Sequence, residues 1–78
     1  MNQYALHIAV RTGILDMVKK ALYGVDINQK DGDGNTPLHL AVQFGFWDIA
    51  TFLMRNGAKA SIENNKGIKV MDFASFYE

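Results

Sequence analysis

The sequence predicts an all-α fold in which helix-turn-helix units stack into a short α-solenoid with β-turn tips. Three observations predict it: the chain repeats itself every 32 to 33 residues, its apolar residues follow helical spacing, and turn-forming residues separate the apolar stretches. Because 78 residues leave room for only one small domain, we expect residues 1–78 to form a single domain.

The internal repeat is visible by aligning "YALHIAVRTGILDMVKKAL" (4–22) with "TPLHLAVQFGFWDIATFLM" (36–54), an offset of 32 residues. The alignment matches His7 with His39 and Gly13 with Gly45. After Gly24 the offset becomes 33, so one residue is missing from the first unit. The units predicted are a degenerate one at 2–30, a full one at 31–63 and a partial one at 64–78.

Each unit is expected to contain two short helices, because apolar residues recur at steps of three and four rather than alternating. In the middle unit, Thr36 is a good N-cap and Pro37 suits the first helical position, where no amide hydrogen is needed. Gly45 and the pair Asn56-Gly57 stand where helices should stop. The helices expected along the chain are 5–12, 15–22, 37–44, 47–55 and 70–77.

The stretch "DGDGN" at 31–35 raises the alternative of a calcium site, because its oxygen-bearing side chains occupy positions 1, 3 and 5 of a calcium loop. The loop is incomplete, since Thr36 stands where glycine is needed and Val42 where the bidentate Glu belongs. We expect instead a turn in which Asp31 and Asn35 bond nearby backbone amides and both glycines take conformations costly for other residues.

Composition excludes several classes of function. Eight basic and eight acidic residues give zero net charge, which argues against general nucleic-acid or anionic-membrane binding. The absence of cysteine excludes disulfides and thiol catalysis, and no apolar run approaches the roughly 20 residues that span a bilayer. The start of the chain is a poor signal peptide, so we expect a cytoplasmic protein, with the nucleus as the alternative.

The middle unit resembles the ankyrin repeat, whose signature T-P-L-H-x-A is present as "TPLHLA" at 36–41, preceded by "DGDGN" and followed by Gly45 and "NGA" at 56–58. The resemblance implies a β-turn and two antiparallel helices per unit. The outer units depart from the signature, with Tyr4-Ala5 in place of Thr-Pro and "KVMD" at 69–72 in place of "TPLH". We therefore expect both ends to lack the usual helix-starting hydrogen bonds.

The two histidines carry a structural role in this resemblance, in which each ties neighbouring turns together. A zinc site would need two further ligands, and no cysteine is present to supply them. Asp16 and Asp48 are equivalent residues of two units rather than a converging pair, so no catalytic set emerges. We expect no enzymatic activity and no cofactor.

The resemblance implies a protein-binding module, acting as an adaptor, scaffold or inhibitor through its concave face and turn tips. The alternative is a small domain that binds a ligand or calcium. The residues that the resemblance places on the concave face are Gln3, Arg11, Thr12, Lys30, Asp33, Asn35, Gln43, Phe44, Glu63, Lys66 and Ile68.

Two groups of aromatic residues add further expectations. Phe46 and Trp47 should half-bury against the neighbouring unit. Phe73, Phe76 and Tyr77 lie on the last helix, whose partner helix is absent, so they predict an open apolar surface. With fewer than three complete units, we expect marginal stability alone, or a homodimer that covers this surface.

Overall fold

The computed structural model describes residues 4–74, which contain five α-helices and no named strand. This confirms the all-α prediction. The helices α1 and α4 have the predicted bounds, α2 and α3 each end one residue early, and the expected residues 75–77 of α5 lie outside the described part. The helices are α1 (Ala5–Thr12), α2 (Leu15–Ala21), α3 (Pro37–Gln43), α4 (Trp47–Arg55) and α5 (Val70–Ala74).

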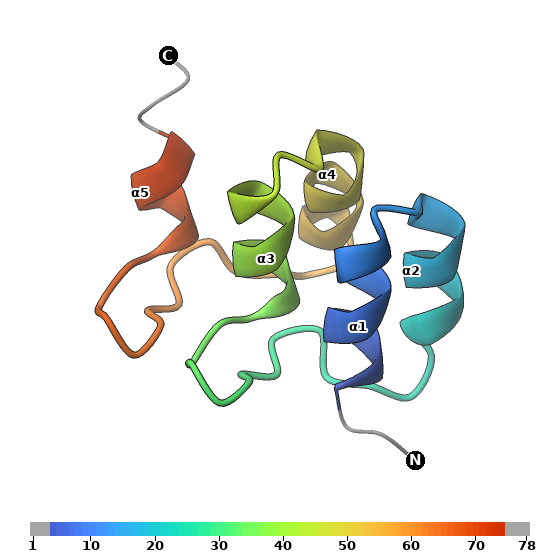
Figure 1. Ribbon diagram of the computed structural model, residues 1–78, viewed down its shortest axis with the longest axis horizontal. Coiled ribbons are helices and arrows are strands. Elements are labelled where there is room, and N and C mark those ends of the chain that lie inside the picture. Colours follow the sequence, from blue (N-terminus) through green and yellow to red (C-terminus); the bar gives the residue numbers. More distant parts are fainter. Residues whose placement is uncertain (1–3, 75–78) are drawn as a thin grey trace.

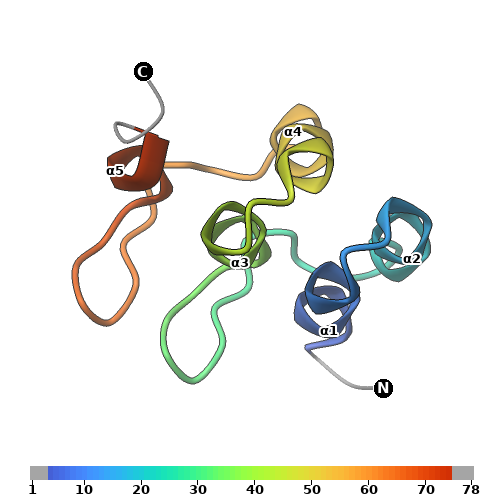
Figure 2. The same ribbon diagram turned by 45° about the horizontal axis from the view of Figure 1, so that its top comes forward.

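The helices form two layers (Figures 1 and 2). The inner layer contains α1, α3 and α5, in which α3 packs against both α1 and α5. The outer layer contains α2 and α4, each paired with the helix that precedes it. Long loops before α3 and α5 project to the same side of the molecule (Figure 2). None of the helices within residues 4–74 is long and apolar enough to pass through a bilayer.

The core follows the apolar stripes of the repeated units. Its largest fully buried aliphatic side chains are Leu6 and Val10 of α1, Val18 of α2, Leu38 of α3, and Ile49 and Leu53 of α4. Each belongs to the i, i+3, i+4 spacing that predicted a helix with one buried face. The core is therefore shared between units, since residues of the first two helix pairs form one cluster.

The start of α3 confirms the predicted N-cap. The Thr36 hydroxyl oxygen accepts from the His39 backbone N–H at 3.3 Å, and His39 Nδ1 accepts from the Thr36 backbone N–H at 3.1 Å. This reciprocal pair is a capping box in which histidine takes the place of the usual Glu or Gln. At the start of α1, Tyr4 makes no side-chain cap, as its departure from the signature predicted.

The expectation that α5 lacks the usual helix-starting hydrogen bonds was wrong for one of the two bonds. The Lys69 backbone N–H donates to Asp72 Oδ2 at 2.9 Å, which satisfies one amide at the start of this helix. Asp72 occupies the position equivalent to His39, and its carboxylate reaches back to the same amide that the imidazole reaches in α3. The third unit therefore keeps half of the capping box with a different side chain.

Both histidines connect their helix to the turn of the next unit. His7 Nε2 donates to the Asn35 carbonyl oxygen and His39 Nε2 to the Ile68 carbonyl oxygen, both at 2.9 Å. Because a carbonyl oxygen can only accept, the Nε2 atom carries the hydrogen in each ring. The two buried imidazoles therefore link consecutive units, in agreement with the structural role expected of them.

Candidate functional site

The loops before α3 and α5 each end in a projecting tip, residues 31–35 and 64–68. The two tips are built by the same turn. Asp31 Oδ1 accepts from the backbone N–H groups of Asp33 and Asn35, both at 2.9 Å. In the next unit, Asn64 Oδ1 accepts from the backbone N–H groups of Lys66 and Ile68, at 2.9 and 3.0 Å. Asp31 and Asn64 are 33 residues apart, so an oxygen at the same position of the repeat organises each turn.

The first tip is the segment considered from the sequence as a calcium loop. One oxygen of the Asp31 carboxylate is engaged by the two backbone amides of its own turn. Residues 4–74 contain no group of three His, Cys, Asp or Glu side chains that could hold a metal ion. The first tip thus forms the turn expected before α3.

Two details of the expected turn were wrong. The Asn35 side chain does not bond a nearby backbone amide; its Oδ1 accepts from Asn64 Nδ2 at 3.0 Å. Gly34 has a positive φ of 77°, whereas Gly32 does not have a positive φ. The tip of the following unit explains the first of these differences, because it supplies the Asn64 partner.

The tips are joined to each other by further hydrogen bonds. The Asn65 backbone N–H donates to the Asp33 carbonyl oxygen, and Asn65 Nδ2 donates to the Gly32 carbonyl oxygen, both at 3.0 Å. A Cβ atom at Gly34 would collide with Asn65, so only glycine permits this close approach. Asn64 and Asn65 were not among the residues predicted from the sequence. The available signal was that Asn64 aligns with Asp31 at the offset of 33.

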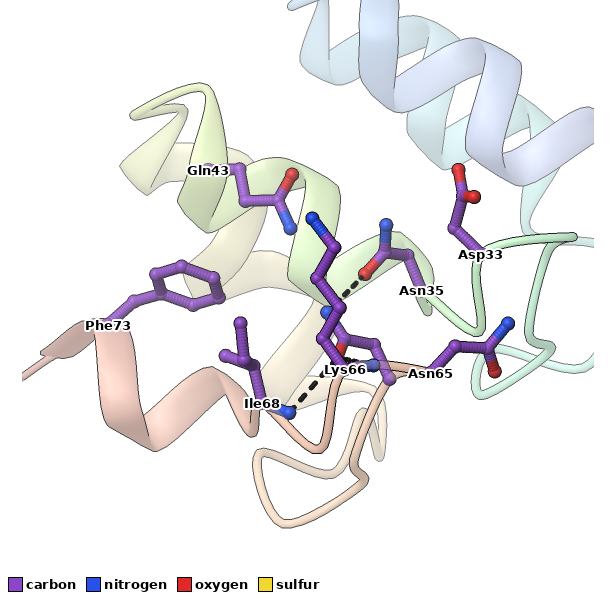
Figure 3. Close-up of a pocket in the computed structure, with 8 residues that line it drawn as sticks. Asp33, Asn35, Gln43, Asn65, Lys66, Ile68 and Phe73 are labelled. Atoms are coloured by element: carbon purple, nitrogen blue, oxygen red, sulfur yellow. Dashed lines mark hydrogen bonds between the residues drawn. The ribbon is translucent and has the colours of Figure 1, made fainter.

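Between the tips and the inner helices lies a groove with a volume of about 420 Å³ (Figure 3). It combines one acidic group, one basic group, several amides and two apolar side chains. It brings together six residues selected from the sequence, which are Asp33, Asn35, Gln43, Lys66, Ile68 and Phe73, and its lining is completed by Asn64 and Asn65.

A second hollow of about 320 Å³ lies between α1 and the first tip. Arg11, a predicted residue that does not line the groove, is found there beside Tyr4 and Ile8 of the same segment. Asp33 lines both hollows, so the groove and the second hollow are neighbours on one face of the molecule.

Four other predicted residues line neither hollow. The Thr12 hydroxyl donates to the Ala9 carbonyl oxygen at 2.6 Å and accepts from the Ile14 backbone N–H, which is a role at the end of α1. Glu63 forms an isolated β-bridge with Lys69. Lys30 is exposed on the loop, and Phe44, 51% exposed, contacts the Phe46 ring at the far end of α3.

The aromatic residues have different surroundings. Phe46 is half-buried, and its ring lies so close to Gly13 that an added Cβ would stand 3.0 Å away. It therefore packs against the turn of the first unit, as expected, while Trp47 is 45% exposed. Phe73 is half-buried against the core. Gln3, Phe76 and Tyr77 lie outside the described residues, so the dimer surface stays a prediction.

Comparison with known proteins identifies the repeat. The family model "Ankyrin repeats (3 copies)" matches residues 1–76. Human protein phosphatase 1 regulatory subunit 27 is 47% identical over 64 residues, covering 81% of this chain and 42% of that protein. The ADP-ribosylation factor GTPase-activating protein AGD2 of Arabidopsis thaliana is 39% identical over 70 residues, covering 88% of this chain and 9% of that protein.

A third relative, the mouse ankyrin repeat domain-containing protein 13C, is 36% identical over 64 residues, which are 82% of this chain and 12% of that protein. The chain thus spans less than half the length of each of these relatives. The family match covers nearly all of the sequence, and the stacked helix pairs with projecting turns agree with it. This chain belongs to the ankyrin repeat family.

Proposed function

We propose that this chain is a non-catalytic protein-binding module that holds a partner polypeptide in the groove between its two tips. The observation that carries the proposal is the convergence of polar and apolar side chains from both tips, α3 and α5 on one groove. A mixed lining of this kind suits protein recognition, in which apolar contacts anchor the partner and polar groups select it. The activity would be that of an adaptor, scaffold or inhibitor.

The family and one relative support the same class of function. Ankyrin repeats are protein-interaction modules, and one relative is, by its name, a regulatory subunit of a protein phosphatase. The residues lining the groove include no hydroxyl, thiol or imidazole side chain, so a Ser–His or Cys–His pair for nucleophilic catalysis is absent from it. We therefore favour binding over catalysis, and we keep the division into units at 2–30, 31–63 and 64–78 and the cytoplasmic location as predictions.

The test is affinity capture from the source cells with matched variants. Gln43→Ala with Lys66→Glu alters two groove side chains that make no hydrogen bond within the described residues. The control is Gln29→Ala with Lys59→Glu, which makes the same two changes outside the groove. We expect the wild type and the control to retain a partner that the groove variant loses. Equal capture by the groove variant would contradict the proposal.

A further inference from the structure

The hydrogen bonds of the second tip determine how Asn35 faces the groove. Asn64 Oδ1 accepts from two backbone N–H groups, so the other end of this amide must be its donor, Nδ2. That donor bonds Asn35 at 3.0 Å, which requires Asn35 to present its oxygen, Oδ1, to Asn64. The Asn35 amino group, Nδ2, takes no part in this bond. It makes no hydrogen bond within residues 4–74, and it belongs to the groove lining.

Lys66 and Gln43 add two further donors to the same groove. The Lys66 side chain extends across the groove toward Gln43 and Asn35 in the view of Figure 3. Neither the Lys66 ammonium nor the Gln43 side-chain amide has a hydrogen-bond or ion-pair partner in the described part of the chain. The groove thus contains one donor fixed by its amide partner, Asn35 Nδ2, and two mobile ones, the Lys66 ammonium and the Gln43 amide.

The groove also contains one acidic group, Asp33, which would repel an anion. Its carboxylate points toward the side of α1 in Figure 3, and Asp33 also lines the second hollow beside Arg11. No ion pair joins Asp33 to Lys66 within residues 4–74. The positive charge of Lys66 is therefore not neutralised by the one carboxylate that shares the groove.

Apolar side chains border the donors on one side. Ile68 and Phe73 lie next to each other on the α5 side of the groove (Figure 3). Both are partly buried, so part of each surface remains open to a partner. An aliphatic or aromatic side chain placed there would remove apolar area from water, which is favourable.

We infer that this groove binds an Asp or Glu side chain of the partner polypeptide, with a large apolar residue of the same segment against Ile68 and Phe73. A carboxylate has two oxygens that accept several hydrogen bonds, and bonds from an ammonium to a carboxylate are stronger than those between neutral groups. It would accept from Asn35 Nδ2, Lys66 Nζ and the rotated Gln43 amide. The inference rests on the proposed protein-binding function and names the chemistry of the partner.

Selection from a displayed library of random peptides tests the inference on the whole chain. The library is selected in parallel on the wild type, on Lys66→Gln and on Lys59→Gln, which removes the same charge outside the groove. We expect the wild type and Lys59→Gln to enrich peptides with an acidic residue beside a large apolar one. We expect Lys66→Gln to lose the acidic preference and to keep the apolar preference.

Affinities of one enriched peptide then test the pairing itself. Replacing its acidic residue by the matching amide should weaken binding to the wild type by about fivefold, the range of partly exposed ion pairs. The same replacement should have a clearly smaller effect on Lys66→Gln, because the ion pair is already removed there and only the bonds from Asn35 and Gln43 are left to weaken. Asp33→Asn should strengthen binding by about twofold, since it removes a like charge.

Failure of the inference is distinguishable from failure of the proposed function. Peptides that lose binding to Gln43→Ala with Lys66→Glu, but carry no acidic preference, would overturn the carboxylate inference alone. A fivefold loss that persists in Lys66→Gln would do the same. Peptides that bind the groove variant as well as the wild type, or a library that yields no binder, would overturn both.

Discussion

The first helix pair, α1 and α2, and the second, α3 and α4, have the same arrangement, yet equivalent residues in them differ in solvent exposure. Ile8 of α1 is 52% exposed, whereas Leu40, its equivalent in α3, is 3% exposed. Met17 of α2 is 45% exposed, whereas the equivalent Ile49 of α4 is fully buried. A preceding unit stands beside the second pair, and no described unit stands before the first. Burial in this fold thus depends on the neighbouring unit as much as on the residue itself.

The two pairs also differ at the start of their inner helices. His7 and His39 both bond the turn of the next unit through Nε2. His39 Nδ1 accepts from Thr36, whereas His7 Nδ1 is buried and has no hydrogen-bond partner in the described structure. Tyr4 stands where the second unit has Thr36. The link between units therefore forms with or without the local cap, and the cap is a separate source of stability.

The largest expected effect on stability comes from truncating Ile49, the buried member of the equivalent pair Met17 and Ile49. Ile49→Ala should lower the free energy of unfolding by about 3 kcal/mol, because it leaves a cavity in the shared core. Met17→Ala should lower it by less than about 1 kcal/mol, since nearly half of that side chain is already exposed. Urea unfolding followed by circular dichroism measures both. Equal losses would show that the neighbouring unit does not decide burial.

A smaller effect is expected at the tips, where Gly34 and Gly67 occupy equivalent positions with φ of 77° and 73°. Gly67→Ala should cost about 1 kcal/mol through backbone strain alone, because nothing lies within 4 Å of the added Cβ. Gly34→Ala should cost about 2 to 3 kcal/mol, because the strain is joined by a collision with Asn65. Urea unfolding of both variants checks the difference, and a Gly34→Ala loss no larger than that of Gly67→Ala would mean that the tips are not held closely together.

Removing the existing cap should have an intermediate effect. Thr36→Ala should lower the free energy of unfolding by about 1.5 kcal/mol, because the buried His39 backbone N–H and Nδ1 atom both lose a partner. Thr36→Ser keeps the hydroxyl and should recover most of the loss. Urea denaturation compares the two. A serine variant as unstable as the alanine variant would point to the methyl group instead of the hydroxyl.

Supplying a side-chain cap at the start of α1 should have the smallest effect, and this change should raise stability instead of lowering it. Tyr4→Thr should raise the free energy of unfolding by about 0.5 to 1 kcal/mol, because its hydroxyl can cap α1 and donate to His7 Nδ1. The change also removes an edge contact between the Tyr4 and His7 rings, whose centroids are 5.6 Å apart. Tyr4→Ala removes the same contact without adding a cap and is the control. If the threonine variant is no more stable than the alanine variant, the cap does not form.

Much of the candidate site could be selected from the sequence, because turn residues occupy fixed places in the repeat. Asp33 and Asn35 follow from the turn before "TPLH", and Lys66 and Ile68 follow from the same turn one unit later. Phe44 was also selected but lines neither hollow; it directly follows α3, and its ring contacts that of Phe46. The resemblance placed it on the concave face beside Gln43 without fixing the direction of its side chain.

The helices, their turns and the order of the units follow from the sequence alone, because these features depend on interactions between residues close together in the chain. Helical periodicity, Pro37 at a helix start and the glycines at helix ends act within a few residues of each other, so they can be read from the chain. Only the tertiary structure decided which way the groove side chains face. Asn35 turns its amino group outward because Asn64, 29 residues later, takes its oxygen, and that contact exists only when the units are stacked.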